Sequence, residues 1–367
     1  MNIKFFGKSA VTVLIAAILG ASLCILMLLG AAFAWRPQIE RFLQAQTLTL
    51  VIPEVQRRLE YRDLGAAKAE EYINQALRPS ELAKSYRADG PYYGYAKTRY
   101  YRTGGRVLVD EEGFPKIKYG NEYYYNPVTL AQQALAEYSR EGGPTPMFLR
   151  VVDKLLTFQD ERGAFLYPFK FRKYAHGEDY EPGWISGMAQ GQALSVLARA
   201  WHLTKDERYL LAGKAALDFM QVTRGHGGPL TTLAELNSPA LSNHLFVMEY
   251  PATPAVYTLN GFMFVIQGVY DWSVLADPES GGEAKNLFDK FLETLVILLP
   301  YYDLGTFSSY DLSYITLPIL PDGLRRKPHI HAAYHAVHIE QLWALYFLTK
   351  RPVLKETADR WERYVTR

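Results

Sequence analysis

Apolar residues recur at helical spacing through most of the chain. After Pro127, successive segments place apolar side chains three or four positions apart with polar ones between them. Such a stripe lets one side of a helix pack against its neighbours. The pattern predicts helices over 128–139, 146–159, 188–204, 209–223, 261–275, 284–300, 338–349 and 358–365.

Loops marked by glycine and proline separate several of these helices, notably 161–183 and 224–255. Paired helices joined by substantial loops favour an α/α toroid, in which inner and outer helices form a ring and the loops build a cleft on one face. An α-solenoid is the alternative, but the sequence has no repeat of fixed length. We therefore predict a mainly α fold with an α/α toroid over 127–367, and we expect the chemistry in its loops.

The chain before Pro127 changes its pattern twice. Residues 36–90 combine apolar positions at helical spacing with many charges, which predicts a helical stem. Residues 91–126 are rich in tyrosine, glycine and β-branched side chains, with turn signals at Gly104-Gly105 and Glu112-Gly113. This segment is typical of a short β-hairpin.

The N-terminus carries an apolar run from Ser9 to Trp35 that no charged residue interrupts. Because about 20 apolar residues span a bilayer as a helix, we predict a transmembrane signal anchor over 9–35 after a cytoplasmic tail of residues 1–8. A cleaved signal peptide is the alternative, since Ala32-Phe33-Ala34 resembles a cleavage site. Both interpretations place the remaining chain outside the cytosol, in the Golgi lumen of a eukaryote or in the periplasm or exterior of a prokaryote.

Composition narrows the range of partners. The 367 residues carry a formal net charge of +2, so we predict no nucleic-acid partner. The one cysteine, Cys24, lies inside the apolar run, which excludes disulfides within the folded part. Aromatic residues reach 14% of the chain and include 27 tyrosines. Tyrosine serves core packing first, and its flat ring with a polar tip also suits sugar-binding clefts.

Six stretches combine aromatic and polar residues between or at the ends of the predicted helices. They are YYYNPVTLAQQALAEYSR from Tyr123, FQDERGAFLYPFKFRK from Phe158, EPGWISGMAQGQ from Glu181, EYP from Glu249 followed by LNGFMF, YYDLG from Tyr301 followed by YDL, and YHAVHIEQL from Tyr334. In this order they resemble the C-terminal domain of the animal heparosan and heparan sulfate glucuronyl C5-epimerases. The animal enzymes carry a large β-sheet domain before the helical part, and here a short loop from Tyr138 to Phe148 takes its place.

This resemblance implies an enzyme that inverts carbon 5 of D-glucuronate residues to L-iduronate within a heparosan-like polysaccharide. The reaction removes a proton beside the uronate carboxylate and returns one to the other face. Two acid/base groups must therefore flank the sugar ring, and the carboxylate must be neutralised. We predict no cofactor, because the chemistry is not redox and the chain has no Gly-rich nucleotide fingerprint.

The resemblance also assigns the site. It implies catalytic roles for Glu249, Tyr250, Tyr310 and Tyr334, with Glu249 and Tyr334 as the pair of bases. It implies substrate binding by Arg172, Lys173, Asn260, His335, His338 and Lys118. A free tyrosine has a pKa of about 10, so Tyr334 needs positive neighbours to act as a base. The closely spaced histidines have no acidic or thiol third ligand nearby, so we predict no metal.

One departure and several alternatives remain. Ser313 and Tyr314 stand where the family has arginine and histidine, so a substrate-binding cation is missing, and Arg325 and Arg326 are candidates to replace it. A polysaccharide lyase would take the same proton and then expel the group at carbon 4. A glycoside hydrolase needs two carboxylates, and the motifs place only Glu249 well. An inactive protein that binds uronate glycans is the third alternative. The sequence does not decide between a monomer and a homodimer.

Overall fold

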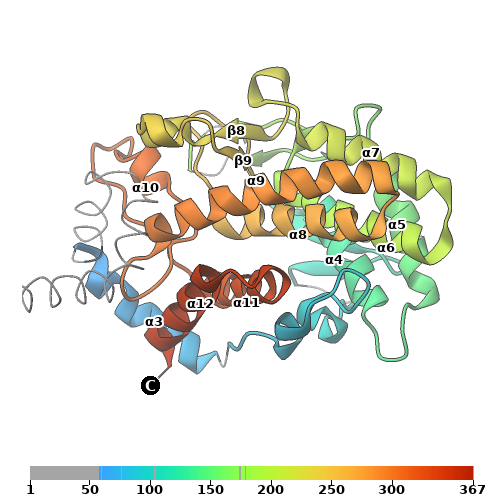
Figure 1. Cartoon of the computed structure of the whole chain (residues 1–367), viewed down its shortest axis with the longest axis horizontal. Helices are drawn as coiled ribbons and strands as arrows, with labels where there is room; N and C mark the ends of the chain where they lie inside the picture. Colours follow the sequence, from blue (N-terminus) through green and yellow to red (C-terminus); the bar gives the residue numbers. More distant parts are fainter. Residues whose placement is uncertain are drawn as a thin grey trace, which may run out of the picture. The chain divides into compact units, whose positions relative to one another are not determined.

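The computed structural model describes residues 58, 60–75, 77–102, 105–172, 175–177 and 179–366, which all belong to one compact unit, residues 56–367 (Figure 1). The α-helices are α3 (Ala66–Asn74), α4 (Pro127–Tyr138), α5 (Pro146–Leu156), α6 (Gly187–Thr204), α7 (Glu207–Met220), α8 (Leu259–Leu275), α9 (Pro278–Tyr302), α10 (Ser313–Thr316), α11 (Ala332–Thr349) and α12 (Pro352–Val365). Short 3-10 helices are η1 (Arg62–Gly65), η2 (Glu81–Ser85), η3 (Tyr93–Lys97), η4 (Arg224–His226), η5 (Leu233–Leu236) and η6 (Pro239–Leu241). The prediction of a mainly helical fold is confirmed.

Capping residues explain where several helices begin. The Asn126 side chain accepts a hydrogen bond from the backbone of Thr129 at 3.2 Å and starts α4, with Pro127 in its first turn. Asp277 caps α9 and His331 caps α11 through their side chains. Both helices start six residues before their predicted starts, because the apolar stripe begins only after a polar or small-residue first turn.

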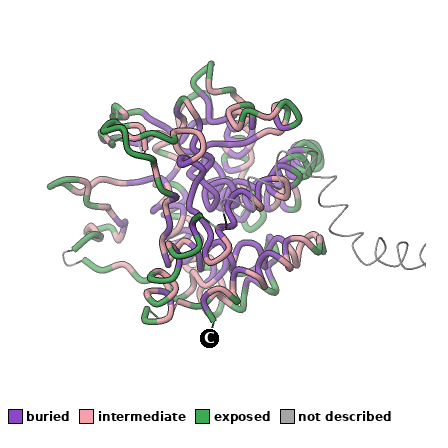
Figure 2. Tube along the Cα trace, turned by 90° about the vertical axis from the view of Figure 1, so that its left-hand side faces the viewer, coloured by how far each residue is buried: buried purple, intermediate pink, exposed green. Residues whose placement is uncertain are grey.

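The helices pack as four consecutive pairs. α5 packs on α4, α7 on α6, α9 on α8 and α12 on α11, while α4, α6, α8 and α11 contact one another in that order. These inner helices carry many buried positions, and Figure 2 shows the buried segments in the middle of the unit. Glycines bring α6 and α8 unusually close, because a Cβ added at Gly268 would lie 1.9 Å from the backbone oxygen of Gly191. The glycines at these two positions therefore allow α6 and α8 to pack closely.

Small antiparallel sheets fill the loops and the segment before α4. β1 (Val107–Val109), β2 (Pro115–Tyr119) and β3 (Glu122–Tyr124) form a three-stranded sheet in the order β1-β2-β3. The two-stranded sheets pair β4 (Leu166–Tyr167) with β7 (Trp184–Ile185), β5 (Phe171–Arg172) with β6 (Asp179–Tyr180), and β8 (Leu230–Thr232) with β9 (Leu245–Val247). Residues of several of these strands line one cavity of the unit.

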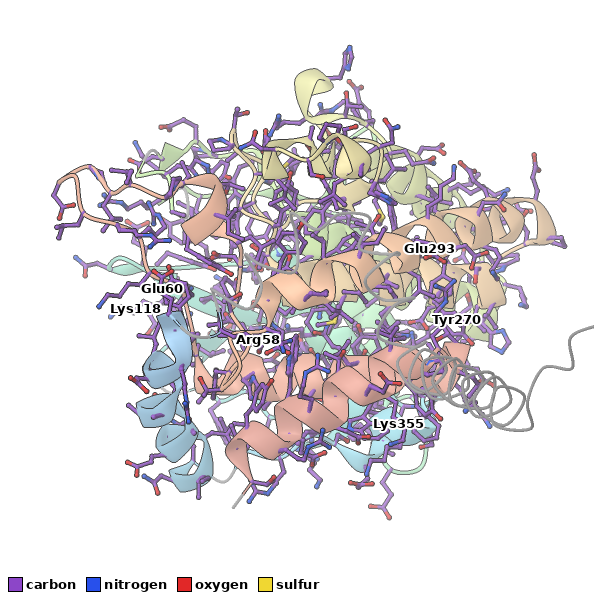
Figure 3. The ribbon with its side chains drawn as sticks, turned by 60° about the vertical axis from the view of Figure 1, so that its left-hand side comes forward. Arg58, Glu60, Lys118, Tyr270, Glu293 and Lys355 are labelled. Atoms are coloured by element: carbon purple, nitrogen blue, oxygen red, sulfur yellow. The ribbon has the colours of Figure 1, made fainter. Side chains whose placement is uncertain are left out.

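The described part of the predicted stem packs against the helical core. α3 contacts α11 and α12. Asp303 is fully buried and accepts hydrogen bonds from Arg58 at 3.1 Å, Arg360 at 2.7 Å and Tyr364 at 3.0 Å (Figure 3 labels Arg58). One carboxylate thus joins the start of the unit, the segment after α9 and the last helix.

The predicted membrane anchor, residues 9–35, lies outside the described residues. Within the part of the chain that the structure describes, no helix has the length and apolar character needed to cross a bilayer.

Candidate active site

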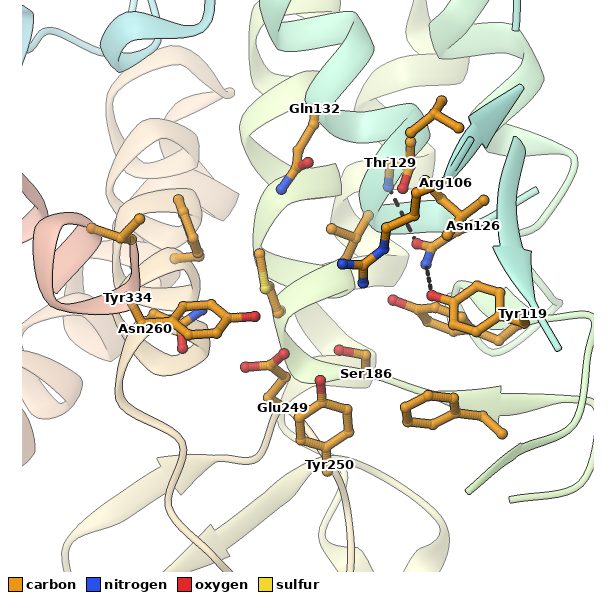
Figure 4. A pocket seen from close by; sticks show the side chains of 18 of the residues that line it. Arg106, Tyr119, Asn126, Thr129, Gln132, Ser186, Glu249, Tyr250, Asn260 and Tyr334 are labelled. Carbon is orange, nitrogen blue, oxygen red and sulfur yellow. Dashed lines mark hydrogen bonds between the residues drawn. The ribbon is translucent and has the colours of Figure 1, made fainter. Parts of the chain in front are cut away.

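A cavity of about 360 Å³ opens between the β1-β2-β3 sheet, the N-terminal end of α6, the segment after β9 and the first turns of α8 and α11 (Figure 4). Its described lining includes the polar residues Arg106, Tyr119, Asn126, Thr129, Gln132, Tyr167, Ser186, Glu249, Tyr250, Asn260 and Tyr334. Elements from four separate stretches of the sequence therefore meet at one place.

Glu249 occupies a desolvated position in this cavity. It follows β9, and its side chain is only 7% exposed. The Tyr310 hydroxyl donates to its Oε1 at 3.5 Å, while Oε2 is buried without a hydrogen-bond partner in the protein. Burial raises the pKa of Glu249 to about 7. A carboxyl group with this pKa can exchange a proton near neutral pH, as a general base must.

Tyr334 points into the same cavity from the first turn of α11, and Figure 4 shows its hydroxyl directed toward the Glu249 carboxyl group. Burial raises the pKa of Tyr334, and the negative charge of Glu249 raises it further. Its phenol therefore keeps its proton at neutral pH and is suited to donate one. The expected positive neighbour is present as Arg106, but its effect on the pKa of Tyr334 is smaller than that of burial.

Two further tyrosines support this pair. Tyr250 lines the cavity beside Glu249, and burial raises its pKa well above the usual value. Tyr310 is 3% exposed and lies behind the lining, with its ring centroid 4.4 Å from that of Tyr334. Its backbone is fixed from both sides, because its N–H donates to His329 and its carbonyl accepts from Leu259. Tyr310 thus holds Glu249 and Tyr334 in place from behind.

Arg106 supplies the cation of the cavity. It immediately precedes β1, it is exposed, and Figure 4 shows its guanidinium directed into the cavity. Among the described residues that line the cavity it is the only cation, and its charge lowers the pKa of Tyr334 against the larger effect of burial. Arg106 is not among the residues predicted from the sequence; its place directly before the apolar run Val107–Val109 and after the turn signal Gly104-Gly105 was the available signal.

An aromatic wall covers another side of the cavity. Phe171 stacks on Trp184 with ring centroids 5.3 Å apart, and Trp184 stacks on Tyr167 at 3.8 Å. Tyr119 accepts a hydrogen bond from Asn126 at 2.7 Å. Flat rings with polar tips are the surface that a pyranose ring packs against.

The structure brings some predicted residues into the cavity and leaves others outside its lining. Asn260 lines it near the start of α8, with its Oδ1 buried and free of protein hydrogen bonds. Lys118 is exposed and absent from the lining, because residues alternate along β2 and its neighbours Ile117 and Tyr119 face the cavity. Arg172 is likewise exposed, next to the lining residue Phe171. The predicted Lys173 lies outside the described residues.

His335 and His338 form a buried network away from the lining. The Ser308 Oγ lies 2.7 Å from Nδ1 of His335 and 2.8 Å from Nδ1 of His338, and Nε2 of His335 lies 3.0 Å from the Trp361 carbonyl oxygen. Burial lowers the pKa of His335 to about 4 and that of His338 well below its usual value. Both rings are therefore neutral, and their contacts join α11 to Ser308 and α12.

Ser313 and Tyr314 stand where the family has arginine and histidine, and neither side chain carries a positive charge. Ser313 is buried, and its N–H donates to Asp311 at 2.8 Å, while the Tyr314 hydroxyl donates to the Tyr301 carbonyl. Arg325 pairs with Glu60 at 2.6 Å, and Arg326 donates to backbone carbonyls. Neither arginine belongs to the cavity lining, so Arg106 is the described cation there.

The described residues contain no group of three or more histidine, cysteine, aspartate or glutamate side chains placed to hold a metal ion. What the cavity does offer is a carboxyl group and a phenol as proton acceptor and donor, a guanidinium for an anion, and aromatic rings for a sugar.

Comparison with known proteins shows the family of this chain. A D-glucuronyl C5-epimerase of Caenorhabditis elegans is 33% identical over 226 residues, which cover 59% of this chain and 34% of that protein. An uncharacterised protein of Methanocaldococcus jannaschii is 27% identical over 221 residues, which cover 59% of this chain and 64% of that protein. The chain thus spans about a third of the length of the first relative and less than two thirds of the second. Residues 159–363 match the family described as D-glucuronyl C5-epimerase C-terminus, and this chain belongs to that family.

Proposed function

We propose that this chain is an epimerase that converts D-glucuronate residues to L-iduronate within a heparosan-like polysaccharide. The observation that carries the proposal is the pair Glu249 and Tyr334, a carboxyl group with a pKa of about 7 and a protonated phenol that point into one cavity. Family membership supports an epimerase, and the polymer named here is our inference from the animal enzymes that the motifs resemble.

The proposed reaction assigns one task to each group. The Glu249 carboxylate takes the proton from carbon 5, and the electron pair of the broken C–H bond moves into the uronate carboxyl group as an enediolate. Tyr334 then gives its hydroxyl proton to the opposite face of carbon 5, and the proton on Glu249 and the charge on Tyr334 are reset by exchange with water. Arg106 and Tyr250 stabilise the negative charge of the uronate and of the intermediate.

The cavity disfavours a glycoside hydrolase. A hydrolase needs two carboxyl groups beside the scissile bond. Glu249 is the only carboxylic acid among the described residues that line the cavity. A lyase shares the first proton transfer, so the product must separate it from the epimerase.

We also propose that the helical unit is an open α/α toroid and that the chain is anchored in a membrane. The four helix pairs fit an open α/α toroid whose loops frame the cleft. The apolar run of residues 9–35 supports a single-pass anchor with the catalytic unit outside the cytosol. Protease protection of the full chain in sealed membrane vesicles tests this orientation.

The deciding experiment is solvent exchange. The full chain is incubated in deuterated water with heparosan or its N-sulfated form, and carbon 5 is followed by NMR. We expect deuterium at carbon 5 together with iduronate signals. An unsaturated product that absorbs ultraviolet light would instead indicate a lyase, and no exchange with retained binding would indicate an inactive glycan-binding protein.

Two variants then test the assigned roles. Tyr334→Phe removes the proton donor and should lower kcat by about 10²-fold or more. Tyr101→Phe makes the same chemical change at a side chain that is 69% exposed, and it should leave exchange unchanged. Arg106→Gln should raise KM because it removes the cation of the cavity. Equal activity of Tyr334→Phe and the wild-type chain would refute the proposed donor.

A further inference from the structure

A second cavity, of about 650 Å³, lies next to the candidate active site. It is formed by residues from the segment before η2, from η2 itself, from η3 and from α11. Tyr95 belongs to the lining of both cavities, so the two cavities adjoin at this residue.

Helix α11 runs along both cavities. Tyr334 and Val337 line the first cavity, and Glu340 lines the second. From Tyr334 to Glu340 the helix rises by about 9 Å. One helix thus contributes side chains to both cavities.

The second cavity carries side chains that suit an acidic sugar. Arg78 and Lys97 are exposed at its lining and bring two positive charges. The acidic Glu81 at the same lining pairs with Lys84 at 3.1 Å, which offsets its charge. Charge-assisted hydrogen bonds from arginine and lysine are the usual way to hold carboxylates and sulfates.

Glu340 adds a fixed acceptor. It accepts a hydrogen bond from the backbone N–H of Ser80 at 3.1 Å, and burial raises its pKa to about 7. A carboxyl group held in this way can accept hydrogen bonds from sugar hydroxyls. Two cations and an acceptor thus occur together outside the catalytic cavity.

We propose that the second cavity is a distal subsite that binds another sugar residue of the same polysaccharide, with Arg78 and Lys97 holding its carboxylate or sulfate and Glu340 accepting from its hydroxyls. This inference rests on the proposed function. It explains how a polymer is held across the catalytic cavity, because binding energy gained at a remote sugar positions the reacting one.

The test compares a long substrate with a short one. The double variant Arg78→Gln/Lys97→Gln is assayed in the full chain for deuterium incorporation at carbon 5, with heparosan polymer and with methyl glucuronide, a single residue of the reacting sugar. We expect KM for the polymer to rise about tenfold, which corresponds to about 1.4 kcal/mol. We expect KM for methyl glucuronide, which fills the catalytic cavity and cannot reach the subsite, to change much less, and kcat to stay unchanged on both. The matched control, Lys290→Gln/Arg363→Gln, removes the same two charges at exposed positions of α9 and α12 and should behave as the wild-type chain.

Each outcome separates the subsite from the proposed function. If both substrates are affected equally, or neither is, the subsite is refuted while the epimerase stands. If the wild-type chain exchanges no carbon-5 proton, the proposed function fails, and titration calorimetry with the same two ligands then decides the subsite. The ratio of polymer affinity to methyl glucuronide affinity must still fall in the double variant, and an unchanged ratio overturns the subsite.

Discussion

Gly261 gives the most direct test of how the helical core positions Glu249. It lies in the first turn of α8, and a Cβ added there would lie 2.3 Å from Oε2, 2.8 Å from Cβ and 3.0 Å from Cδ of Glu249. Ordinary contact begins at 3.4 Å, so Oε2 must retreat by about 1.1 Å, the difference between 3.4 and 2.3 Å. Rotation of the side chain alone does not relieve the contact, because the Glu249 Cβ is also too close.

This displacement should lower both the catalytic rate and the free energy of unfolding. A misplacement of about 1 Å at a reacting group costs on the order of 10²-fold in rate. Overpacking of this kind also costs about 1–3 kcal/mol of unfolding free energy. We therefore expect Gly261→Ala to lower kcat for carbon-5 exchange by about 10²-fold while the chain remains folded. Exchange kinetics in deuterated water and urea unfolding of the same preparation measure the two effects separately.

Gly282→Ala is the matched control. Gly282 also lies in a helix, α9, but an added Cβ there meets no atom within 4 Å. The change should leave exchange unaltered and raise the unfolding free energy by about 0.5–1 kcal/mol, because alanine loses less conformational freedom than glycine in a helix. A folded Gly261→Ala protein with wild-type kcat would refute the argument, since Glu249 would then tolerate a displacement that a catalytic base cannot.

Other perturbations test the charged groups. Exchange should rise with pH through about 7, because a base with that pKa acts only when ionised, and Glu249→Gln should remove both the activity and this titration in a pH–rate profile. Arg199→Met leaves the fully buried Asp271 without its 2.7 Å ion pair and should cost about 3–5 kcal/mol in urea unfolding, whereas replacing both residues by apolar ones should recover most of that loss. Burial raises the pKa of Asp303, but the charges of Arg360 and Arg58 and the hydrogen bonds to it outweigh burial and lower the pKa below its ordinary value. Asp303 therefore contributes stability above its ordinary pKa of about 3.9 that is lost as pH falls through the lower folded value. Thermal melts of Asp303→Asn should show a smaller loss of stability between pH 5 and pH 3, by about 1 kcal/mol, than melts of the wild-type chain.

Local pattern was enough to predict the helical class and most helix positions. A stripe of apolar residues and a cap such as Asn126 with Pro127 are properties of neighbouring residues, so they can be read without the fold. The same logic failed at the starts of α9 and α11, where caps at Asp277 and His331 precede the stripe. The motifs also indicate Glu249, Tyr250, Tyr310 and Tyr334 as candidate site residues, and the structure places Glu249, Tyr250 and Tyr334 in the lining of one cavity.

Tertiary structure decided which of the motif residues meet. Glu249 and Tyr334 are 85 positions apart in the sequence and reach one cavity because Glu249 packs against Gly261 of α8, which in turn contacts α11. Strand alternation directs Lys118 away from that cavity, and the packing of α11 on α12 buries His335. Arg106 enters the cavity only once the sheet has folded over α4.

The difference between what the sequence determines and what the tertiary structure decides has a physical reason. The sequence by itself determined the periodicity of each helix, the caps and the residue types available for proton transfer, because these depend on bonded neighbours. Burial, which raises the pKa of Glu249 to about 7 and keeps Tyr334 protonated, depends on which distant segments exclude water from a side chain. Only the tertiary structure supplies that environment, and it therefore decided which group can accept a proton and which can give one.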